Sequence, residues 1–272
     1  MTNRGFDFKR CARTALATLV LGMPLYSLSS SSDINSQSSM LEQTASAATS
    51  KTQKKQTVKQ KPTQKYHTQT KPAQTQPAIQ KQRKLIAIDP GHGMSNSQSN
   101  VYDPGAVRDG VEEATINLRV AAYLGQDLIN RGYDVVLTRL DDETPCPITK
   151  RNKFSDADLF VSLHCNSSKS EETKATGVRV FYSPKRQSDK TFAANIEDAL
   201  SQTLTEGVQG YSEKNQAVYE GNFLVLNTSR VPAALVEMGY MNNSFDRAYL
   251  QEAEKLIARG IANGLDKQLK TK

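Results

Sequence analysis

Four polar residues of the chain could together carry out hydrolysis at a metal ion. His92, His164 and Glu237 each lie just past a short apolar run, and Glu113 lies near the start of an amphipathic segment. Two imidazoles and one carboxylate are a common ligand set for a catalytic zinc ion, which keeps a fourth position for water. A second carboxylate nearby can serve as a general base. These residue types therefore suit a zinc hydrolase.

The spacing of these residues does not establish a metal site by itself. The two histidines are far apart in sequence and do not form the compact His-Glu-X-X-His motif. The chain has three histidines, and the third, His67, lies in a polar linker. A histidine at a strand end is often a hydrogen-bonded loop residue, and Glu237 could be a structural acid paired with an arginine. From the residues alone, both interpretations stay open.

The elements that would position these residues alternate between strands and helices from residue 84 onward. Strands are predicted over residues 85–88, 135–137, 159–163, 178–182 and 233–236, and helices over 112–130, 192–204 and 248–269. Such alternation predicts a single α/β domain with a central mixed or mostly parallel sheet flanked by helices. Ligand sites of open α/β sheets form outside the carboxyl ends of the strands, where both histidines and Glu237 would lie.

The N-terminal part of the chain differs in composition from this domain. Residues 1–32 combine basic residues with a short apolar run, which predicts a signal peptide or a membrane anchor. Residues 33–83 form a low-complexity basic segment with too few apolar residues to fold, which predicts a disordered N-terminal linker. We therefore expect an exported protein of the periplasm, cell wall or extracellular space, which is either released or held at a membrane by residues 1–32.

The positive net charge of +7 belongs to the linker and not to the folded domain. Residues 51–84 hold ten Lys or Arg and no acid, whereas residues 85–272 hold 21 Lys or Arg and 25 Asp or Glu, a net of −4. No nucleic-acid partner is expected, because the folded domain has no cationic excess. The linker could attract anionic wall polymers or a membrane surface, or it could be a plain spacer.

The chain has three cysteines, which are too few for a disulfide framework. Cys11 would leave with a cleaved signal peptide, and whether Cys146 and Cys165 pair stays open. Side chains alternate along a strand, so Cys165 is expected to point away from His164 into the core.

Eight short segments that follow one another between residues 84 and 269 form a series of motifs. They are IDPGHG (88–93), DPGA (103–106), EEATINL (112–118), the arginine-bearing segments 137–139 and 151–152, ADLFVSLHCN (157–166), VEMGYMNN (236–243) and IARGIANG (257–264). Together they closely resemble the motifs of the zinc-dependent N-acetylmuramoyl-L-alanine amidases of the amidase-3 family.

The resemblance implies a role for each candidate residue. His92, Glu113 and His164 would bind zinc, and Glu237 would be the catalytic base. Glu112 is the alternative to Glu113, and the alignment of the helix motif favours Glu113.

The resemblance also implies the reaction and its substrate, peptidoglycan. The enzyme would be a cell-wall hydrolase, or autolysin, that cuts the amide bond between the lactyl group of N-acetylmuramic acid and L-alanine. The alternatives are another zinc peptidase on the same scaffold and a non-catalytic peptidoglycan-binding module. A protein activator is conceivable, and residues 205–222 are the only candidate for a small regulatory segment.

Overall fold

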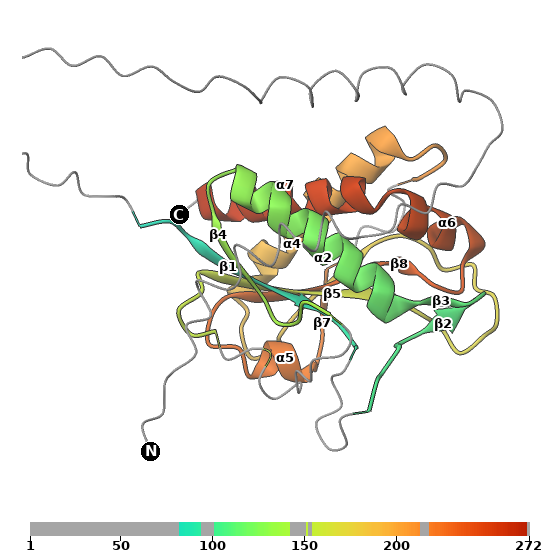
Figure 1. Cartoon of the computed structure of the whole chain (residues 1–272), viewed down its shortest axis with the longest axis horizontal. Coiled ribbons are helices and arrows are strands. Elements are labelled where there is room, and N and C mark those ends of the chain that lie inside the picture. Colours follow the sequence, from blue (N-terminus) through green and yellow to red (C-terminus); the bar gives the residue numbers. More distant parts are fainter. Residues whose placement is uncertain (1–81, 94–100, 142–150, 152–153, 213–217, 271–272) are drawn as a thin grey trace, which may run out of the picture. The chain divides into compact units, whose positions relative to one another are not determined.

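The computed structural model describes residues 82–93, 101–141, 151, 154–212 and 218–270 (Figure 1). The predicted signal or anchor segment, nearly all of the predicted linker and Cys146 lie outside these residues. Among the helices that the model describes, none is both long and apolar enough to cross a membrane.

The centre of the domain is a six-stranded sheet with the order β4-β1-β5-β8-β6-β7. The strands are β1 (Leu85–Pro90), β4 (Asp134–Leu137), β5 (Leu159–Asn166), β6 (Arg179–Tyr182), β7 (Val218–Glu220) and β8 (Ala233–Tyr240). The first four strands in this order are parallel, and β6 and β7 run antiparallel to them. The prediction of a single α/β domain with a mixed, mostly parallel sheet is therefore confirmed.

The helices lie mostly on one face of this sheet (Figure 1). They are α2 (Glu113–Asn130), α4 (Asp189–Gly207), α5 (Leu224–Asn227), α6 (Ser244–Glu252) and α7 (Glu254–Lys270). Helix α7 packs against α2 and α4, and Gly264 permits close packing because a Cβ there would lie 2.5 Å from Ile196 Cα. The predicted helix 248–269 is wrong in one respect: it is two helices, α6 and α7, divided at Ala253.

Alternation along the strands divides the apolar side chains into two cores. Ile86 and Val161 belong to the larger core under α2, α4 and α7, whereas Phe160 and Leu235 belong to a smaller core with residues of α5. In β5, Cys165 belongs to the larger core, so it points away from His164, as predicted. The face that carries His164 has only the short helix α5 among the described helices.

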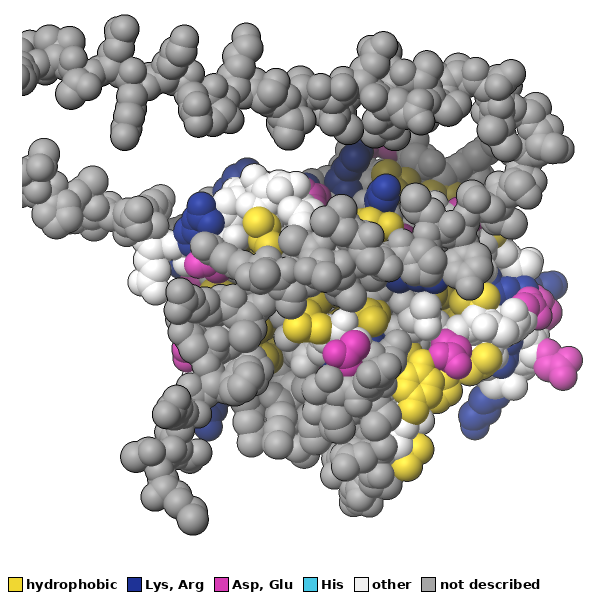
Figure 2. Space-filling model, in the orientation of Figure 1, with side chains coloured by type: hydrophobic (Ala, Val, Ile, Leu, Met, Phe, Trp, Pro, Cys, Tyr) yellow, Lys and Arg dark blue, Asp and Glu magenta, His cyan; other side chains and the backbone are white. Residues whose placement is uncertain are grey.

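Two short strands, β2 (Val107–Arg108) and β3 (Val111–Glu112), form an antiparallel hairpin just before α2. The hairpin was not predicted, and it leads the chain directly into the first turn of α2. In space-filling view, acidic, basic and hydrophobic side chains are interspersed on the described surface that faces the viewer (Figure 2).

Candidate active site

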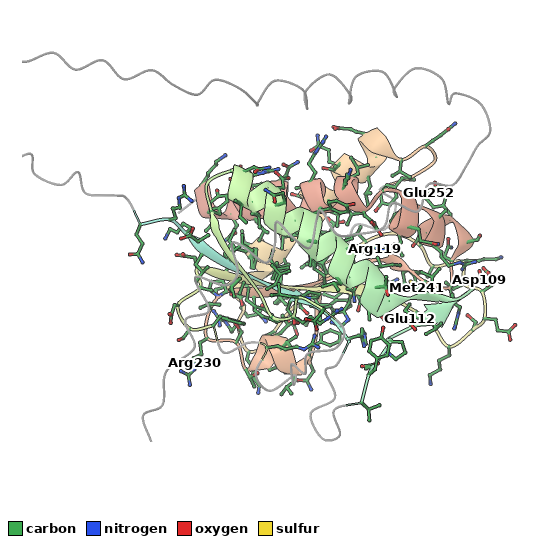
Figure 3. The ribbon with its side chains drawn as sticks, viewed as in Figure 1. Asp109, Glu112, Arg119, Arg230, Met241 and Glu252 are labelled. Atoms are coloured by element: carbon green, nitrogen blue, oxygen red, sulfur yellow. The ribbon has the colours of Figure 1, made fainter. Side chains whose placement is uncertain are left out.

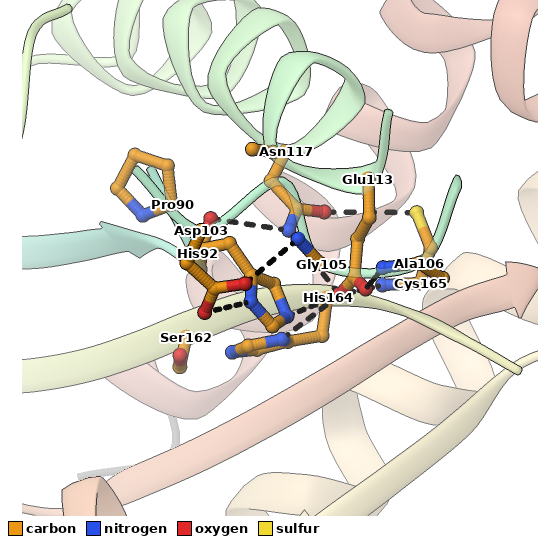
Figure 4. A network of polar contacts seen from close by, with 12 residues as sticks. Pro90, His92, Asp103, Gly105, Ala106, Glu113, Asn117, Ser162, His164 and Cys165 are labelled. Atoms are coloured by element: carbon orange, nitrogen blue, oxygen red, sulfur yellow. Dashed lines mark hydrogen bonds and ion pairs between the residues drawn. The ribbon is translucent and has the colours of Figure 1, made fainter. Parts of the chain in front are cut away.

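The three predicted metal ligands lie together at the carboxyl edge of the sheet (Figure 4). Glu113 Oε1 is 3.0 Å from His92 Nε2 and 3.0 Å from His164 Nδ1. The possible ligand atoms of the three residues all lie within 4.8 Å of one another. Residues from the loop after β1, from α2 and from β5 thus converge on one point, with a donor set of two imidazole nitrogens and a carboxylate oxygen.

Strand pairing brings the two histidines together. Strands β1 and β5 are parallel neighbours, with Pro90 opposite Leu163, so the loop after β1 passes beside His164. His92 turns the chain with a positive φ of 63°. A side chain at Gly91 would overlap the His164 ring, so the motif needs glycine at this position.

Glu113 is the first residue of α2, and its backbone and side chain are both fixed. Its amide donates to Ala106 O at 2.9 Å, and the Ala106 amide donates back to Glu113 Oε2 at 2.9 Å. The Cys165 amide donates to Glu113 Oε1 at 3.0 Å. Gly105 has a φ of 68°, and a Cβ there would lie 2.6 Å from Glu113 Oε2. The turn motif at 103–106 therefore leaves room for the carboxylate.

The neighbouring Glu112 points elsewhere. Its Oε2 accepts a hydrogen bond from the Tyr102 hydroxyl, and the labelled stick view shows it at the start of α2 (Figure 3). The structure thus places Glu113, and not Glu112, with the histidines.

Asp103 also contacts the cluster, although its residue type and position did not mark it as a candidate site residue. Its Oδ2 is 2.9 Å from His92 Nδ1, and its Oδ1 accepts from the Gly105 amide at 3.0 Å. A histidine that donates Nδ1–H to a carboxylate can bind a metal through Nε2 once Nε2 has lost its proton, and Nε2 of His92 faces Glu113. The contact depends on the backbone bridge between Gly93 and Asp103, which no local sequence signal indicates.

The charges of the cluster stabilise one another. Burial opposes the charge on His92, but the carboxylates of Glu113 and Asp103 outweigh it and raise the pKa of His92 to about 9. Burial also opposes the charge on Glu113, but hydrogen bonds from His164 and His92 hold the pKa of Glu113 well below its usual range. Glu113 is therefore an ionised carboxylate in a site that attracts cations.

Glu237 lies on β8, directly opposite His164 in the parallel pair. Its Oε2 is buried and has no hydrogen-bond partner in the described part of the chain. Burial raises the pKa of Glu237 to about 7. No arginine among the described residues forms an ion pair with Glu237, although the charge of Arg179, opposite it on β6, opposes the rise in its pKa. A buried acceptor without a partner calls for a group supplied by a ligand or water.

The two arginine-bearing segments hold the backbone around the cluster. Arg139 Nη2 donates to Gly91 O at 2.9 Å and to Ala114 O at 2.7 Å. Arg151 Nη1 donates to Pro90 O at 2.9 Å and lies 3.3 Å from Asp89 Oδ1. Both arginines are buried. They therefore fix the loop that carries His92 and the start of α2 relative to each other.

Strands β5 and β8 are longer than predicted. Each has eight residues, so His164 and Glu237 lie inside strands and not just past their ends. Their positions in strands fix both side chains more firmly than a loop would.

Comparisons with known proteins agree on one family. A family model described as N-acetylmuramoyl-L-alanine amidase matches residues 86–267. The chain is 31% identical over 193 residues to the sporulation-specific N-acetylmuramoyl-L-alanine amidase of Bacillus subtilis, and the match covers 69% of each chain. It is 30% identical over 189 residues to the uncharacterized protein YqiI of Bacillus subtilis, covering 67% of this chain and 84% of that protein.

A solved structure gives the same result. The catalytic domain of CwlV, an N-acetylmuramoyl-L-alanine amidase from Bacillus (Paenibacillus) polymyxa var. colistinus, is 31% identical with a TM-score of 0.59. The match covers 70% of this chain and 99% of that domain. It spans the described domain and not the N-terminal segments.

Proposed function

The chain belongs to the amidase-3 family of N-acetylmuramoyl-L-alanine amidases, and on this premise we propose that His92, Glu113 and His164 hold a zinc ion beside the catalytic base Glu237. Its reaction is hydrolysis of the amide bond between the lactyl group of N-acetylmuramic acid and L-alanine in peptidoglycan. One observation carries the assignment of the site: three ligand atoms within 4.8 Å of one another lie beside a strand that presents a second carboxylate.

The donor set fits zinc. Two imidazole nitrogens and one carboxylate oxygen are the protein ligands of many catalytic zinc sites, and Asp103 gives His92 the carboxylate partner that metal-bound histidines usually have. When bound, zinc would supply a Lewis acid and would lower the pKa of a water molecule to about 7.

The chain's own residues then handle the protons. Glu237 accepts a proton from the attacking water while the water oxygen bonds to the amide carbonyl carbon. It returns the proton to the alanine nitrogen as the carbon–nitrogen bond breaks, which leaves a lactyl carboxylate and a free amine. A pKa of about 7 suits a residue that must both take and give a proton near neutral pH.

The N-terminal segments deliver this domain, on our proposal, to its substrate. Residues 1–32 would direct export or anchor the chain, residues 33–83 would form the linker, and residues 84–272 would form the catalytic domain. Relatives named as probable cell wall amidases of staphylococci support a site of action outside the cytoplasm. The basic linker would keep the domain near anionic wall polymers or membrane lipids.

Removal of the metal is expected to abolish cleavage. The full-length protein, dialysed against a chelator, should no longer release free amino groups from purified peptidoglycan, and added zinc should restore the release. Sedimentation with peptidoglycan gives a readout that does not need catalysis. Cleavage that persists after verified zinc removal would contradict the proposal, and binding without cleavage in the zinc-loaded protein would favour the non-catalytic module.

Replacement of Asp103 by asparagine is expected to weaken zinc binding by about 10- to 100-fold. The amide can no longer hold the His92 ring through a charge-assisted hydrogen bond. Competition with a chromophoric chelator measures the zinc affinity. Asp109→Asn is the matched control, because Asp109 is exposed and pairs with Arg247 instead of a ligand. Equal affinities in the two variants would show that Asp103 does not support the metal site.

A further inference from the structure

Arg179 lies beside the proposed catalytic base and has a side-chain donor that no described residue uses. It is the first residue of β6 and lies opposite Glu237 in the antiparallel pair with β8. Side chains of directly opposed residues project from the same face of a sheet, with Cβ atoms about 4.5–5.5 Å apart. Arg179 Nε is buried and has no hydrogen-bond partner in the described part of the chain.

Two aromatic rings hold the Arg179 guanidinium in place. Its Cζ lies 5.4 Å from the centroid of the Tyr219 ring and 5.1 Å from that of the Tyr240 ring. Cation–π contacts of this kind orient a guanidinium without using its hydrogen-bond donors. The Nε–H group therefore has no acceptor among the described residues, and the planar fork of N–H groups in a guanidinium matches a carboxylate best.

An apolar surface continues from Arg179 on the same face of the sheet. Phe181, two residues further along β6, contacts the rings of Tyr219 and Phe223 at centroid distances of 5.5 Å and 5.2 Å. Tyr219 and Phe223 are 38% and 36% exposed, and the adjacent Leu224 is 45% exposed. An exposed apolar patch next to a cation suits a ligand with both carboxylate and aliphatic groups.

The direction of the reaction decides which part of the substrate meets this surface. Glu237 returns a proton to the leaving nitrogen, so the peptide that begins at this nitrogen leaves from the side of Glu237. Arg179 is on that side by strand register. The stem peptide carries carboxylates, whereas the sugar that carries the scissile amide is neutral.

We propose that Arg179 is a specificity-determining residue that binds the α-carboxylate of the second stem-peptide residue, in a subsite framed by Tyr219 and Tyr240. This inference rests on the proposed function of Glu237. The aromatic patch would contact the aliphatic parts of the following residues. The subsite would favour peptides whose second residue keeps its carboxylate over peptides in which it is amidated.

Two matched substrates test the proposal with the full-length, zinc-loaded protein. One is N-acetylmuramoyl-L-alanyl-γ-D-glutamyl-L-lysine, and the other differs only by amidation of the glutamate α-carboxylate. Arg179→Gln is expected to raise KM for the acid by roughly 10- to 100-fold, the range for a lost hydrogen bond to a charged group. The kcat/KM for the amide should also fall, because loss of the Arg179 charge beside Glu237 acts on both substrates alike, but it should fall much less than that for the acid. Measurable turnover of the amide also shows that the variant folds.

Two further variants separate a specific role from a structural one. Arg179→Lys keeps the charge and is expected to recover part of the preference for the acid. Arg230 is an exposed arginine just before the amino end of β8, and Figure 3 shows it away from Glu112. Arg230→Gln should leave kcat/KM unchanged for both substrates. The proposal would be overturned if Arg179→Gln lowered kcat/KM equally for the acid and the amide, or lowered it for neither.

A binding measurement keeps this test separate from the reaction itself. Calorimetry compares the tripeptide L-alanyl-γ-D-glutamyl-L-lysine with its α-amide, and the wild-type protein should prefer the acid whereas Arg179→Gln should not. If the wild-type protein cleaves neither substrate but keeps this preference, the proposed reaction fails and the Arg179 subsite stands. If cleavage occurs and no preference depends on Arg179, the subsite fails and the reaction stands.

Discussion

Replacement of Glu237 by glutamine is expected to lower kcat by about 10²- to 10⁴-fold while the zinc content of the purified protein stays unchanged. Glutamine has nearly the same size and shape but cannot accept a proton from water. Glu237 Oε2 has no hydrogen-bond partner among the described residues, so the change removes no hydrogen bond at this atom. The effect should therefore fall on turnover and not on stability.

Turnover on purified peptidoglycan and zinc content by atomic emission are measured on the same samples. Glu252→Gln removes an exposed carboxylate at the end of α6 and is the control for the loss of one carboxylate (Figure 3). Turnover close to that of the wild-type protein in Glu237→Gln would show that another group is the base. Loss of zinc together with activity would instead make Glu237 a ligand.

Replacement of Glu113 by glutamine is expected to weaken zinc binding by at least about 100-fold, since loss of an outer contact alone costs about 10- to 100-fold. The carboxylate lies between two imidazoles and also accepts the amides of Ala106 and Cys165. The substitution removes a carboxylate ligand and also the negative charge that would balance the charge of the metal ion. Activity should fall to the level of the chelated protein.

The adjacent residue supplies the control for this prediction. Glu112→Gln makes the same chemical change one position earlier and removes only the contact with Tyr102. It should retain zinc and activity. If Glu112→Gln lost zinc and Glu113→Gln kept it, Glu112 would be the ligand. The placement of Glu113 beside the histidines at the start of α2 would then be wrong.

The sheet was predictable where apolar residues run without interruption. The runs 85–88, 159–163 and 233–236 form β1, β5 and β8 because each is buried on both faces. The carboxyl ends of β5 and β8 were missed because His164 and Glu237 interrupt the apolar pattern although both are inside the strands. Function, and not propensity, decides the residues at these two positions.

Other elements lack a local signal. Helices α6 and α7 divide at Ala253, where neither glycine nor proline marks a break. Strand β7 has only three residues, and its pairing with β6 joins residues that are far apart in sequence.

The site divides in the same way between local and long-range information. The histidines and Glu237 could be picked out by residue type and by their positions near strand ends, and the choice of Glu113 came from the family resemblance. Asp103 and Arg179 could not be found, because one depends on a bridge between two loops and the other on the register of an antiparallel pair. Such pairings join residues far apart in sequence and leave no periodic pattern.

The position of the cut in peptidoglycan tests the central claim most directly. Purified peptidoglycan is digested with the full-length, zinc-loaded protein, and the products are identified by tandem mass spectrometry. We expect stem peptides with a free L-alanine amino terminus and glycan strands with free lactyl carboxylates. Both should be absent from a digest with Glu237→Gln. Products cut within the stem peptide, with the lactyl–alanine bond intact, would contradict the central claim and identify the protein as a zinc peptidase.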